Sequence, residues 1–147
     1  MKDIKKLIKE NELDLSTLVV FTRAEHSIHR IEYQTIKQSG LTPAQFGVLE
    51  ALYNKGDLRI CELIEKILTT SGNITVVIKN LEKDGLIKKK PDPNDKRSCI
   101  ISLTEEGEKI IEDILPNHIE NIKSIFEILT EEEKNTLKNI LKKFKKL

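Results

Sequence analysis

The chain has 147 residues, of which 38% are hydrophobic and 33% are charged, and its formal net charge at pH 7 is +1. This length suits one domain of modest size, and the composition suits long amphipathic helices around a small core. No apolar run approaches the roughly 18 residues of a membrane span, and the charged N-terminus lacks the apolar core of a signal peptide. We therefore expect a cytoplasmic protein.

The N-terminal quarter of the chain predicts one long helix. From Leu13 onward, apolar residues recur at spacings of three and four, and Gly40 should end the helix near Ser39. The lysine-rich residues 1–12 ahead of it have no clear pattern, and their order stays open. The apolar positions of the long helix are Leu18, Phe21, Ala24, Ile28 and Ile31.

Residues 42–68 predict two short helices with a short strand between them. Thr42-Pro43-Ala44-Gln45 is a capping box with proline at the first helical position, and Asn54-Lys55-Gly56 ends this helix. Leu58-Arg59-Ile60 is a candidate strand, and Cys61 to Leu68 is a second helix. The residues expected to face inward are Phe46, Leu49, Leu52 and Tyr53 in the first helix and Leu63, Ile64 and Ile67 in the second.

A third helix is predicted to begin at Ser71, whose hydroxyl suits an N-cap, and to end at Gly85, since glycine tolerates the left-handed conformation of a helix end. One face is apolar and needs a surface to pack on. The other face has mostly small polar or cationic side chains, which can approach a nucleic-acid backbone. The apolar face has Ile74, Val77, Ile78 and Leu81, and the polar face has Asn73, Thr75, Val76, Lys79 and Lys83.

A basic β-hairpin follows this helix directly. Leu86 to Lys90 and Ser98 to Leu103 have strand-like composition, and the residues from Pro91 to Asp95 form a turn-rich tip. The strand at 58–60 can pair with the hairpin and stabilise it. Residues 70–99 have seven basic and four acidic side chains, a net charge of about +3 that exceeds the charge of the whole chain.

Two short helices joined by a turn at Thr69-Thr70, with a basic exposed face on the second, make a helix-turn-helix, and the hairpin makes it a winged one. Such a helix can enter the DNA major groove, and a basic hairpin tip can reach the neighbouring minor groove. The same elements can also form a small core whose lysines only solvate its surface. Spacing and charge alone therefore leave DNA binding and a purely structural role about equally open.

The C-terminal third predicts two more helices. Thr104-Glu105-Glu106 begins a long one that runs to about Leu129, with Pro116 as a point where it should kink or break. The capping box from Thr130 to Glu133 begins the last helix. Residues 104–135 have ten acidic and three basic side chains, which phosphate would repel, and the apolar stripes left over suggest a dimer. The last helix runs to about Lys145, with Leu137, Ile140, Leu141 and Phe144 expected to face inward.

Five segments, in order and at the right separations, resemble the MarR (multiple-antibiotic-resistance regulator) family of transcriptional regulators. The resemblance implies an obligate homodimer of winged helix-turn-helix lobes that represses from a pseudo-palindromic operator. It also implies an effector, which is a small phenolic or amphipathic molecule in many members and thiol oxidation or a metal in others. The segments are Leu41 to Leu49, Thr70 to Thr75, Leu81 to Ile87, Asp95 to Arg97 and Ile101 to Gly107.

The resemblance assigns major-groove contacts to the helix that begins at Ser71. Ser71 and Thr75 would meet phosphates, because their hydroxyls suit backbone contacts. Asn73 and Lys79 would hydrogen-bond base edges, and Val76 would touch a thymine methyl.

The resemblance also assigns the wing. Arg97 would enter the minor groove, with Asp95 holding its guanidinium in place. The lysines of the wing would neutralise phosphates, or alternatively keep an exposed strand edge soluble, and alternation turns at least one of them away from DNA. The wing lysines are Lys88, Lys89, Lys90 and Lys96. An effector pocket is expected between the first long helix and the DNA-binding lobe, at Phe21, Ile28 and Phe46.

Other chemistry is expected to be absent. His26 and His29 share a helix face near Glu25, and His118 lies on a later helix, but their spacing matches no closed metal-ligand set. We expect them to be surface residues or polar groups at the dimer or effector junction, where a histidine can make binding pH-sensitive. Cys61 and Cys99 are expected to be small buried hydrophobes, and no enzyme motif or cofactor site is present in the sequence.

The sequence thus predicts a mainly α protein with a small β wing. Residues 1–40 and 105–147 are the expected dimerisation helices, and residues 41–104 are the DNA-binding lobe, within one intertwined domain. The expected function is a sequence-specific regulator of double-stranded DNA, acting as a homodimeric repressor that a small molecule releases. Two alternatives stay open, namely a winged-helix protein–protein module and a metal-responsive regulator of the same fold.

Overall fold

The computed structural model describes residues 3–67 and 71–146, without the side chains of Ser71, Gly72 and Lys146. The chain divides into two compact units. The winged unit comprises residues 34–122, and the terminal unit comprises residues 1–33 together with 123–147. Two long helices, α2 (Glu12–Gln38) and α6 (Glu105–Phe126), contribute residues to both units. Among the described residues, no helix is both long and apolar enough to cross a membrane.

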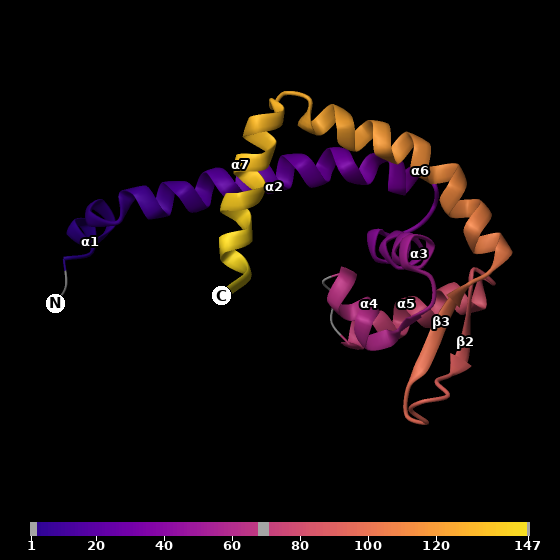
Figure 1. The fold of residues 1–147 in the computed structure, drawn as a ribbon. Coiled ribbons are helices and arrows are strands. Elements are labelled where there is room, and N and C mark those ends of the chain that lie inside the picture. The colour runs from indigo at the N-terminus through magenta and orange to yellow at the C-terminus, as the bar shows by residue number, and fades with distance from the viewer. Residues whose placement is uncertain (1–2, 68–70, 147) are drawn as a thin grey trace. The chain divides into compact units, whose positions relative to one another are not determined.

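The winged unit has the predicted order of elements, with three helices and a three-stranded sheet between α2 and α6. Figure 1 shows the helices and the β2–β3 hairpin of this unit. The predicted fold class, mainly α with a small β wing, is confirmed. The turn expected at Thr69-Thr70 lies outside the described residues. The elements are α3 (Pro43–Lys55), β1 (Leu58–Arg59), α4 (Ile60–Ile67), α5 (Ser71–Lys83), β2 (Ile87–Pro91) and β3 (Cys99–Leu103).

The core of the winged unit is formed by apolar faces from each of its layers. The predicted inward residues Phe46, Leu49 and Leu52 of α3 are at most 3% exposed. The prediction was wrong for Tyr53, which is 38% exposed, because its hydroxyl donates a hydrogen bond of 3.1 Å to the Glu112 carboxylate at the surface. The other fully buried apolar side chains come from several elements and are Ile36, Val48, Leu63, Ile74, Ile78, Leu81, Ile101 and Ile111.

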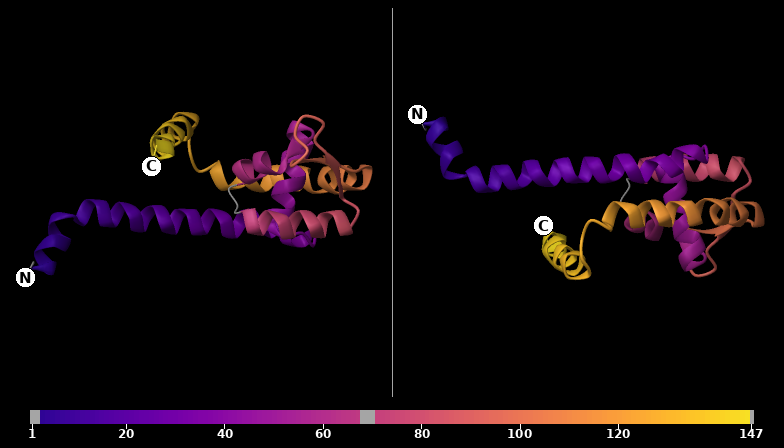
Figure 2. Two further views of the ribbon diagram at one scale, coloured as in Figure 1. Left: turned by 90° about the horizontal axis from the view of Figure 1, so that it is seen from below. Right: turned by 90° about the horizontal axis from the view of Figure 1, so that it is seen from above.

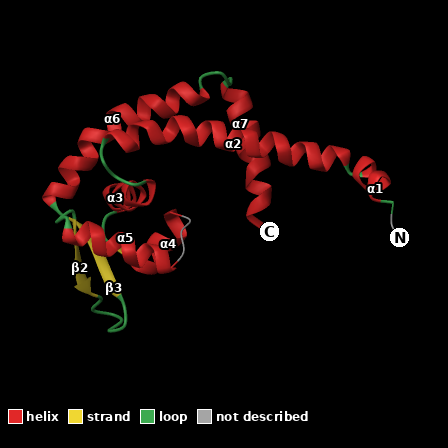
Figure 3. Ribbon diagram, turned by 180° about the vertical axis from the view of Figure 1, so that it is seen from behind, coloured by secondary structure: helices red, strands yellow, loops and turns green. Residues whose placement is uncertain are grey.

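The sheet is antiparallel, with strand order β1-β3-β2, so the short strand predicted at 58–60 does join the hairpin. Leu58 pairs with Ile101, and Lys89 pairs with the same Ile101 from the other side. Figure 3 shows the two long strands of the hairpin leading to a loop at their far end. Ile101 is completely buried on the central strand, which fixes the hairpin to the helices.

Local sequence signals set most helix ends. Thr42 and Gln45 form the expected capping box at α3, and Gly56 and Gly85 follow α3 and α5 with positive φ values of 78° and 74°, which glycine adopts without strain. Pro116 was expected to kink or break α6, and the structure shows no break, because one helix runs from Glu105 to Phe126 with the proline inside it. Burial of α6 on both sides of the proline, at Ile111, Ile114 and His118, compensates for the lost backbone hydrogen bond.

Thr104 links the end of α5 to the start of α6. Its hydroxyl donates to the carbonyl of Gly85 at 2.7 Å and accepts from the N–H of Gly107 at 3.1 Å. Its own N–H donates to the carbonyl of Leu86 at 3.1 Å. Gly107 lies so close to that carbonyl that a Cβ added to it would stand 2.1 Å from the oxygen. Glycine at 107 therefore permits a close approach of helix to backbone that no other residue allows.

The terminal unit is made of the ends of the long helices and of three shorter ones. Asp3 caps α1 (Ile4–Glu10), a helix that the sequence pattern left open. Thr130 begins α7 (Glu131–Leu141) with the predicted capping box, and the 3-10 helix η1 (Lys142–Lys146) follows. Figure 2 shows α2 as one unbroken helix in both views.

No side chain within residues 3–33 and 123–145 is buried in the single chain. The inward orientation predicted for Ile140, Leu141 and Phe144 is therefore wrong for the isolated subunit, where each is at least 40% exposed. Their periodicity identified an apolar face correctly, but nothing in one chain covers that face among the described residues.

Candidate nucleic-acid interface

Helix α5 separates its side chains into a buried and an exposed face, as the sequence predicted. Ile74, Val77, Ile78 and Leu81 are at most 7% exposed and hold the helix on the core. The four predicted DNA contacts with described side chains, Asn73, Thr75, Val76 and Lys79, are all exposed, and the exposed Glu82 follows Lys79 in the last turn of the helix. The side chain of Ser71, the fifth predicted contact and the predicted N-cap, lies outside the described residues.

An exposed apolar side chain on this face is informative. Val76 is 57% exposed although it belongs to a helix whose other large aliphatic residues are buried. A methyl-bearing side chain next to amide, hydroxyl and ammonium groups suits a surface that meets both base edges and thymine methyl groups. The arrangement therefore has the chemistry that a major groove requires.

The wing presents its cationic groups on exposed positions. Alternation along β2 places Lys88 and Lys90 on one face of the strand and Lys89 on the other. Lys96 and Arg97 are exposed in the loop between β2 and β3. These five side chains give the hairpin a positive potential along its arm and at its tip, which favours contact with phosphates.

Hydrogen bonds order the loop of the wing. The N–H of Asp92 donates to the carbonyl of Ser98 at 3.1 Å, and the N–H of Ser98 donates to the carbonyl of Asp95 at 2.9 Å. The carboxylate of Asp92 accepts from the N–H of Asn94 at 2.8 Å, and that of Asp95 accepts from the N–H of Arg97 at 3.0 Å. Both aspartates thus form the local turns for which this side chain is suited.

The predicted contact between Asp95 and Arg97 differs from the expected one. Asp95 was expected to hold the guanidinium, but the hydrogen bond that the structure gives to its carboxylate comes from the main chain of Arg97. Asp95 therefore sets the backbone of the turn that presents Arg97. The reason is geometric, because a carboxylate two residues ahead of an N–H closes a turn with little loss of side-chain freedom.

One residue pair of the wing was missed in the sequence. Nε of Arg59, in β1, lies 2.6 Å from Oδ2 of Asp92, at the end of β2, and the Asp92 side chain is completely buried. No local pattern could have found the pair, because β1 and β2 are brought onto one sheet only by their common neighbour β3.

Comparison with known proteins agrees with this geometry. Residues 41–99 match the family model described as the MarR family. The HTH-type transcriptional regulator MhqR of Bacillus subtilis strain 168 is 37% identical over 132 residues, which is 90% of this chain and 91% of MhqR. The chain belongs to the MarR family. Like its relatives, it is a DNA-binding transcriptional regulator and not an enzyme.

Two solved structures of MarR-family type are also similar. A mutant MarR from Escherichia coli in complex with operator DNA is 26% identical, with a TM-score of 0.78, over 91% of this chain and 96% of that one. BpsR of Bordetella bronchiseptica, whose DNA binding is regulated by 6-hydroxynicotinic acid, is 28% identical, with a TM-score of 0.77, over 88% and 98% of the two chains.

The histidines of this MarR-family chain do not gather around a metal. His29 lies between two carboxylates of its own helix, with Nδ1 at 2.6 Å from Glu32 and Nε2 at 3.5 Å from Glu25, and it stacks on Tyr33. His118 is 2% exposed and shares a hydrogen bond of 2.9 Å with the Thr35 hydroxyl. Among the described residues no three metal-ligating groups come together.

The cysteines differ from their prediction in part. Cys99 is half-buried in β3, but Cys61 is exposed, so its expected burial is wrong. Cys61 lies in the first turn of α4, where Leu63 is the side chain that turns to the core. Helical geometry places residues two apart on different sides of a helix, which leaves Cys61 on the outer one.

The effector pocket stays a prediction. In the terminal unit Phe21 is exposed and Ile28 is half-buried. In the winged unit Phe46 is 3% exposed, and its ring lies against that of His118 with 4.6 Å between ring centroids.

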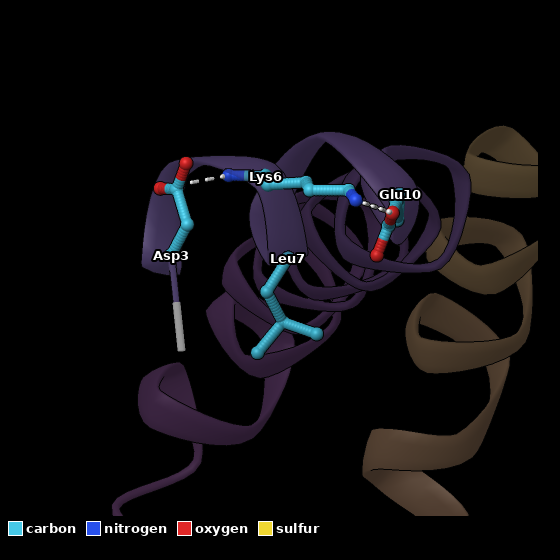
Figure 4. Close-up of a pocket in the computed structure, with 4 residues that line it drawn as sticks. All are labelled: Asp3, Lys6, Leu7 and Glu10. Atoms are coloured by element: carbon cyan, nitrogen blue, oxygen red, sulfur yellow. Dashed lines mark hydrogen bonds and ion pairs between the residues drawn. The ribbon is translucent and has the colours of Figure 1, made fainter. Parts of the chain in front are cut away.

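A hollow does lie along α1 (Figure 4), but all four residues that line it, Asp3, Lys6, Leu7 and Glu10, come from α1 and the residue that caps it. Its polar groups already serve that helix, since Asp3 caps it and Lys6 pairs with Glu10 at 3.8 Å. The hollow is therefore lined by a single helix and its cap, and none of the residues expected to form the effector pocket lines it.

Proposed function

We propose that this MarR-family chain is a homodimeric repressor that reads the two halves of a pseudo-palindromic operator with α5 and the wing of each subunit. The observation that carries the proposal is the two-faced character of α5. Its apolar face is buried, while its exposed face combines Asn73, Thr75, Val76 and Lys79 in the first turns, with the exposed carboxylate of Glu82 only in the last turn, directly ahead of a hairpin rich in exposed cations.

The roles we propose on α5 follow from the chemistry of each side chain. Asn73 and Lys79 hydrogen-bond base edges, because an amide and an ammonium group match the donor and acceptor patterns of the major groove. Thr75, together with Ser71, contacts phosphate oxygens, and Val76 contacts a thymine methyl.

On the wing we propose that Arg97 enters the minor groove, where narrow A·T-rich segments attract a guanidinium. Asp95 fixes the main chain of Arg97 through the hydrogen bond of 3.0 Å. Lys88, Lys90 and Lys96 neutralise phosphates, so their contribution depends on salt and not on sequence.

The DNA part of the proposal is tested by fluorescence anisotropy with the protein's own upstream DNA and a scrambled duplex, across a salt series. We expect a saturable complex on the former with one dimer per site and a steep salt slope. Lys79→Ala should weaken the operator more than the scrambled duplex, and Arg97→Ala should relax the preference for A·T-rich minor groove. Lys109→Ala, which removes an exposed lysine of the acidic helix α6, is the charge-matched control. Equal, weak binding to both duplexes would instead favour a protein–protein role.

The homodimer is proposed from the terminal unit. A compact unit without a buried side chain in its described residues has no core of its own, although many large apolar side chains line it. A second copy of the chain offers the same apolar faces and can bury them in a two-fold interface. The exposed apolar residues are Ile4, Leu7, Ile8, Leu13, Leu15, Leu18, Val19, Val20, Phe21, Ile128, Ile140, Leu141 and Phe144.

Two identical substitutions test the dimer. Val20 in the terminal unit and Val76 on α5 are 67% and 57% exposed in the single chain. Val20→Asp should shift sedimentation from dimer toward monomer, because it places a charge in the proposed interface. Val76→Asp should leave the dimer intact while it weakens DNA binding. A wild-type protein that sediments as a monomer at micromolar concentration contradicts the proposal.

We propose, finally, that a small hydroxylated aromatic molecule relieves repression. The support is the similarity to BpsR, whose DNA binding is regulated by 6-hydroxynicotinic acid. The test is a titration of the preformed operator complex with 6-hydroxynicotinic acid and with simple phenols such as 4-hydroxybenzoate. A loss of anisotropy that saturates with one of them supports relief, and an unchanged complex with all of them removes this ligand class.

A further inference from the structure

The Arg59–Asp92 pair joins opposite edges of the sheet at the point where β2 enters the loop of the wing. Arg59 lies on β1 and pairs with Ile100 of the central strand β3. Asp92 follows the last residue of β2, Pro91, which pairs with Cys99 on the other side of β3. The arginine side chain therefore reaches past the central strand to a carboxylate at the end of the other edge strand, with 2.6 Å between Nε and Oδ2.

Burial makes this contact unlike a surface ion pair. The Asp92 side chain is 0% exposed, and that of Arg59 is 44% exposed. Of the ion pairs between residues that the structure describes, this is the only one with a completely buried member. A carboxylate removed from water needs compensation for its charge, or it moves back to water.

The compensation of Asp92 comes from two directions. Oδ1 accepts the hydrogen bond from Asn94 inside the wing loop. Oδ2 accepts no well-aligned hydrogen bond within the described residues, so its short contact to Arg59 is an electrostatic one. Without Arg59, Oδ2 is a buried charge with no partner of opposite sign in that structure.

A series of contacts leads from this pair to the predicted minor-groove residue. The N–H of Asp92 donates to Ser98, the N–H of Ser98 donates to Asp95, and the carboxylate of Asp95 accepts from the N–H of Arg97. Movement of Asp92 toward solvent therefore displaces the turn that presents Arg97. The guanidinium of Arg97 itself need not touch Arg59 for the two residues to be coupled.

We propose that Arg59 is a positioning residue for the wing, which holds Asp92 in the interior and thereby fixes the turn that delivers Arg97 to DNA. This rests on the proposed function of the wing. Arg59 acts through the position of Arg97 and makes no DNA contact that contributes to affinity.

The free protein gives the first test, which needs no DNA. Hydrogen exchange of the full chain should show faster exchange of the wing amides, those of Asp92, Asn94, Arg97 and Ser98, in Arg59→Ala than in wild type. Asp92→Asn is a second variant, to be used if Arg59→Ala does not fold. It keeps a side-chain oxygen that can accept the hydrogen bond from Asn94, and it removes the buried charge. The control Asp57→Asn, an exposed aspartate just before β1, should leave these amides unchanged. Unchanged wing exchange in Arg59→Ala overturns the proposal whatever DNA binding shows.

A double-mutant cycle on the operator gives the second test. Arg59→Ala should lower operator affinity about tenfold, because it withdraws the Arg97 contact, but less than about twofold in the Arg97→Ala background. Combining Arg59→Ala with Asp92→Asn should restore most of the operator affinity. The neutral asparagine has no charge that must move from the interior to water when Arg59 is absent. A direct phosphate contact of Arg59 predicts the opposite: an undiminished loss in the Arg97→Ala background and a salt slope smaller by about 0.9 per subunit, which is about 1.8 for the dimer.

The outcomes separate the two proposals. Additive losses in the cycle overturn the positioning role while the DNA-binding function stands. A lower melting temperature with unchanged wing exchange and unchanged affinity also overturns it and leaves Arg59 with a stabilising role alone. If the wild-type protein does not distinguish operator from scrambled duplex, the proposed function is refuted. The positioning role of Arg59 in DNA binding is then refuted as well, even if the exchange data show an ordered wing.

Discussion

The close approach of α6 to the backbone at Leu86 predicts opposite effects for the same substitution at two helical glycines. Gly107 and Gly47 both lie in helices and both have ordinary helical dihedral angles, so alanine fits either backbone. At Gly47 an added Cβ meets only the Ile67 side chain, at 3.4 Å. At Gly107 it meets the Leu86 carbonyl oxygen at 2.1 Å and Cδ1 of Leu103 at 3.0 Å.

The magnitudes follow from these distances. Gly47→Ala should stabilise the protein by about 0.5–1 kcal/mol, because alanine is the better helix former and its methyl makes an ordinary contact. Gly107→Ala gains the same propensity but forces α6 away from Leu86, which costs about 1–3 kcal/mol of overpacking. The displaced carbonyl also weakens its hydrogen bond from Thr104, worth about 1 kcal/mol. The net loss at Gly107 is roughly 1–3 kcal/mol.

The measurement is urea unfolding followed by circular dichroism, at one protein concentration for all variants, because dimerisation links stability to concentration. The free energies of unfolding should fall in the order Gly47→Ala, wild type, Gly107→Ala. A Gly107→Ala protein as stable as wild type refutes the reasoning, since it means that α6 can move away from Leu86 without cost.

Three further predictions concern the tyrosines, the core and a helix cap. The pKa of Tyr53 is raised above the ordinary 10.0 by its hydrogen bond to Glu112 and by the charge of that carboxylate, and the pKa of Tyr33 is raised by burial and by neighbouring carboxylates. The chain has two tyrosines and no tryptophan, so absorbance at 295 nm should show titration above pH 10 in the native protein and near 10 in urea. Because the folded pKa values are raised, this stabilisation is complete below pH 10 and is lost as the pH rises through them; coincident native and denatured titrations would contradict it. Leu49→Ala, at a completely buried position of α3, should lower the free energy of unfolding by about 2–5 kcal/mol in the same urea assay. Thr42→Ala should cost about 1 kcal/mol by removing one half of the capping box at α3, and a loss as large as that at Leu49 would show that Thr42 does more than cap.

Local signals were sufficient wherever one segment determines its own conformation. The capping boxes at Thr42 and Thr130 begin their helices as predicted, and Gly85 ends α5 in the left-handed region. The spacing of Ile74, Val77, Ile78 and Leu81 identified the buried face of α5, and with it the exposed face that we propose meets DNA. These features depend on hydrogen bonds and side-chain directions within one or two helical turns, which the order of residues largely specifies.

Periodicity identifies an apolar face but not the surface that covers it. Leu141 and Phe144 follow the helical pattern as well as Ile74 does, yet they are exposed in the single chain. Tyr53 and Cys61 are also exposed, although their sequence positions suggested burial. Whether an apolar side chain is buried depends on which other element, or which other subunit, reaches it.

The sequence by itself thus determined the helices, the hairpin, the exposed face of α5 and the resemblance to the MarR family, because each rests on short-range pattern. Only the tertiary structure decided that Arg59 lies against Asp92 and that Gly107 lies against the Leu86 carbonyl. Both contacts join residues far apart in the chain, and strand register and helix packing bring them together. No local property of these residues specifies how close they come to each other in the folded chain, so such contacts follow from the packed fold alone.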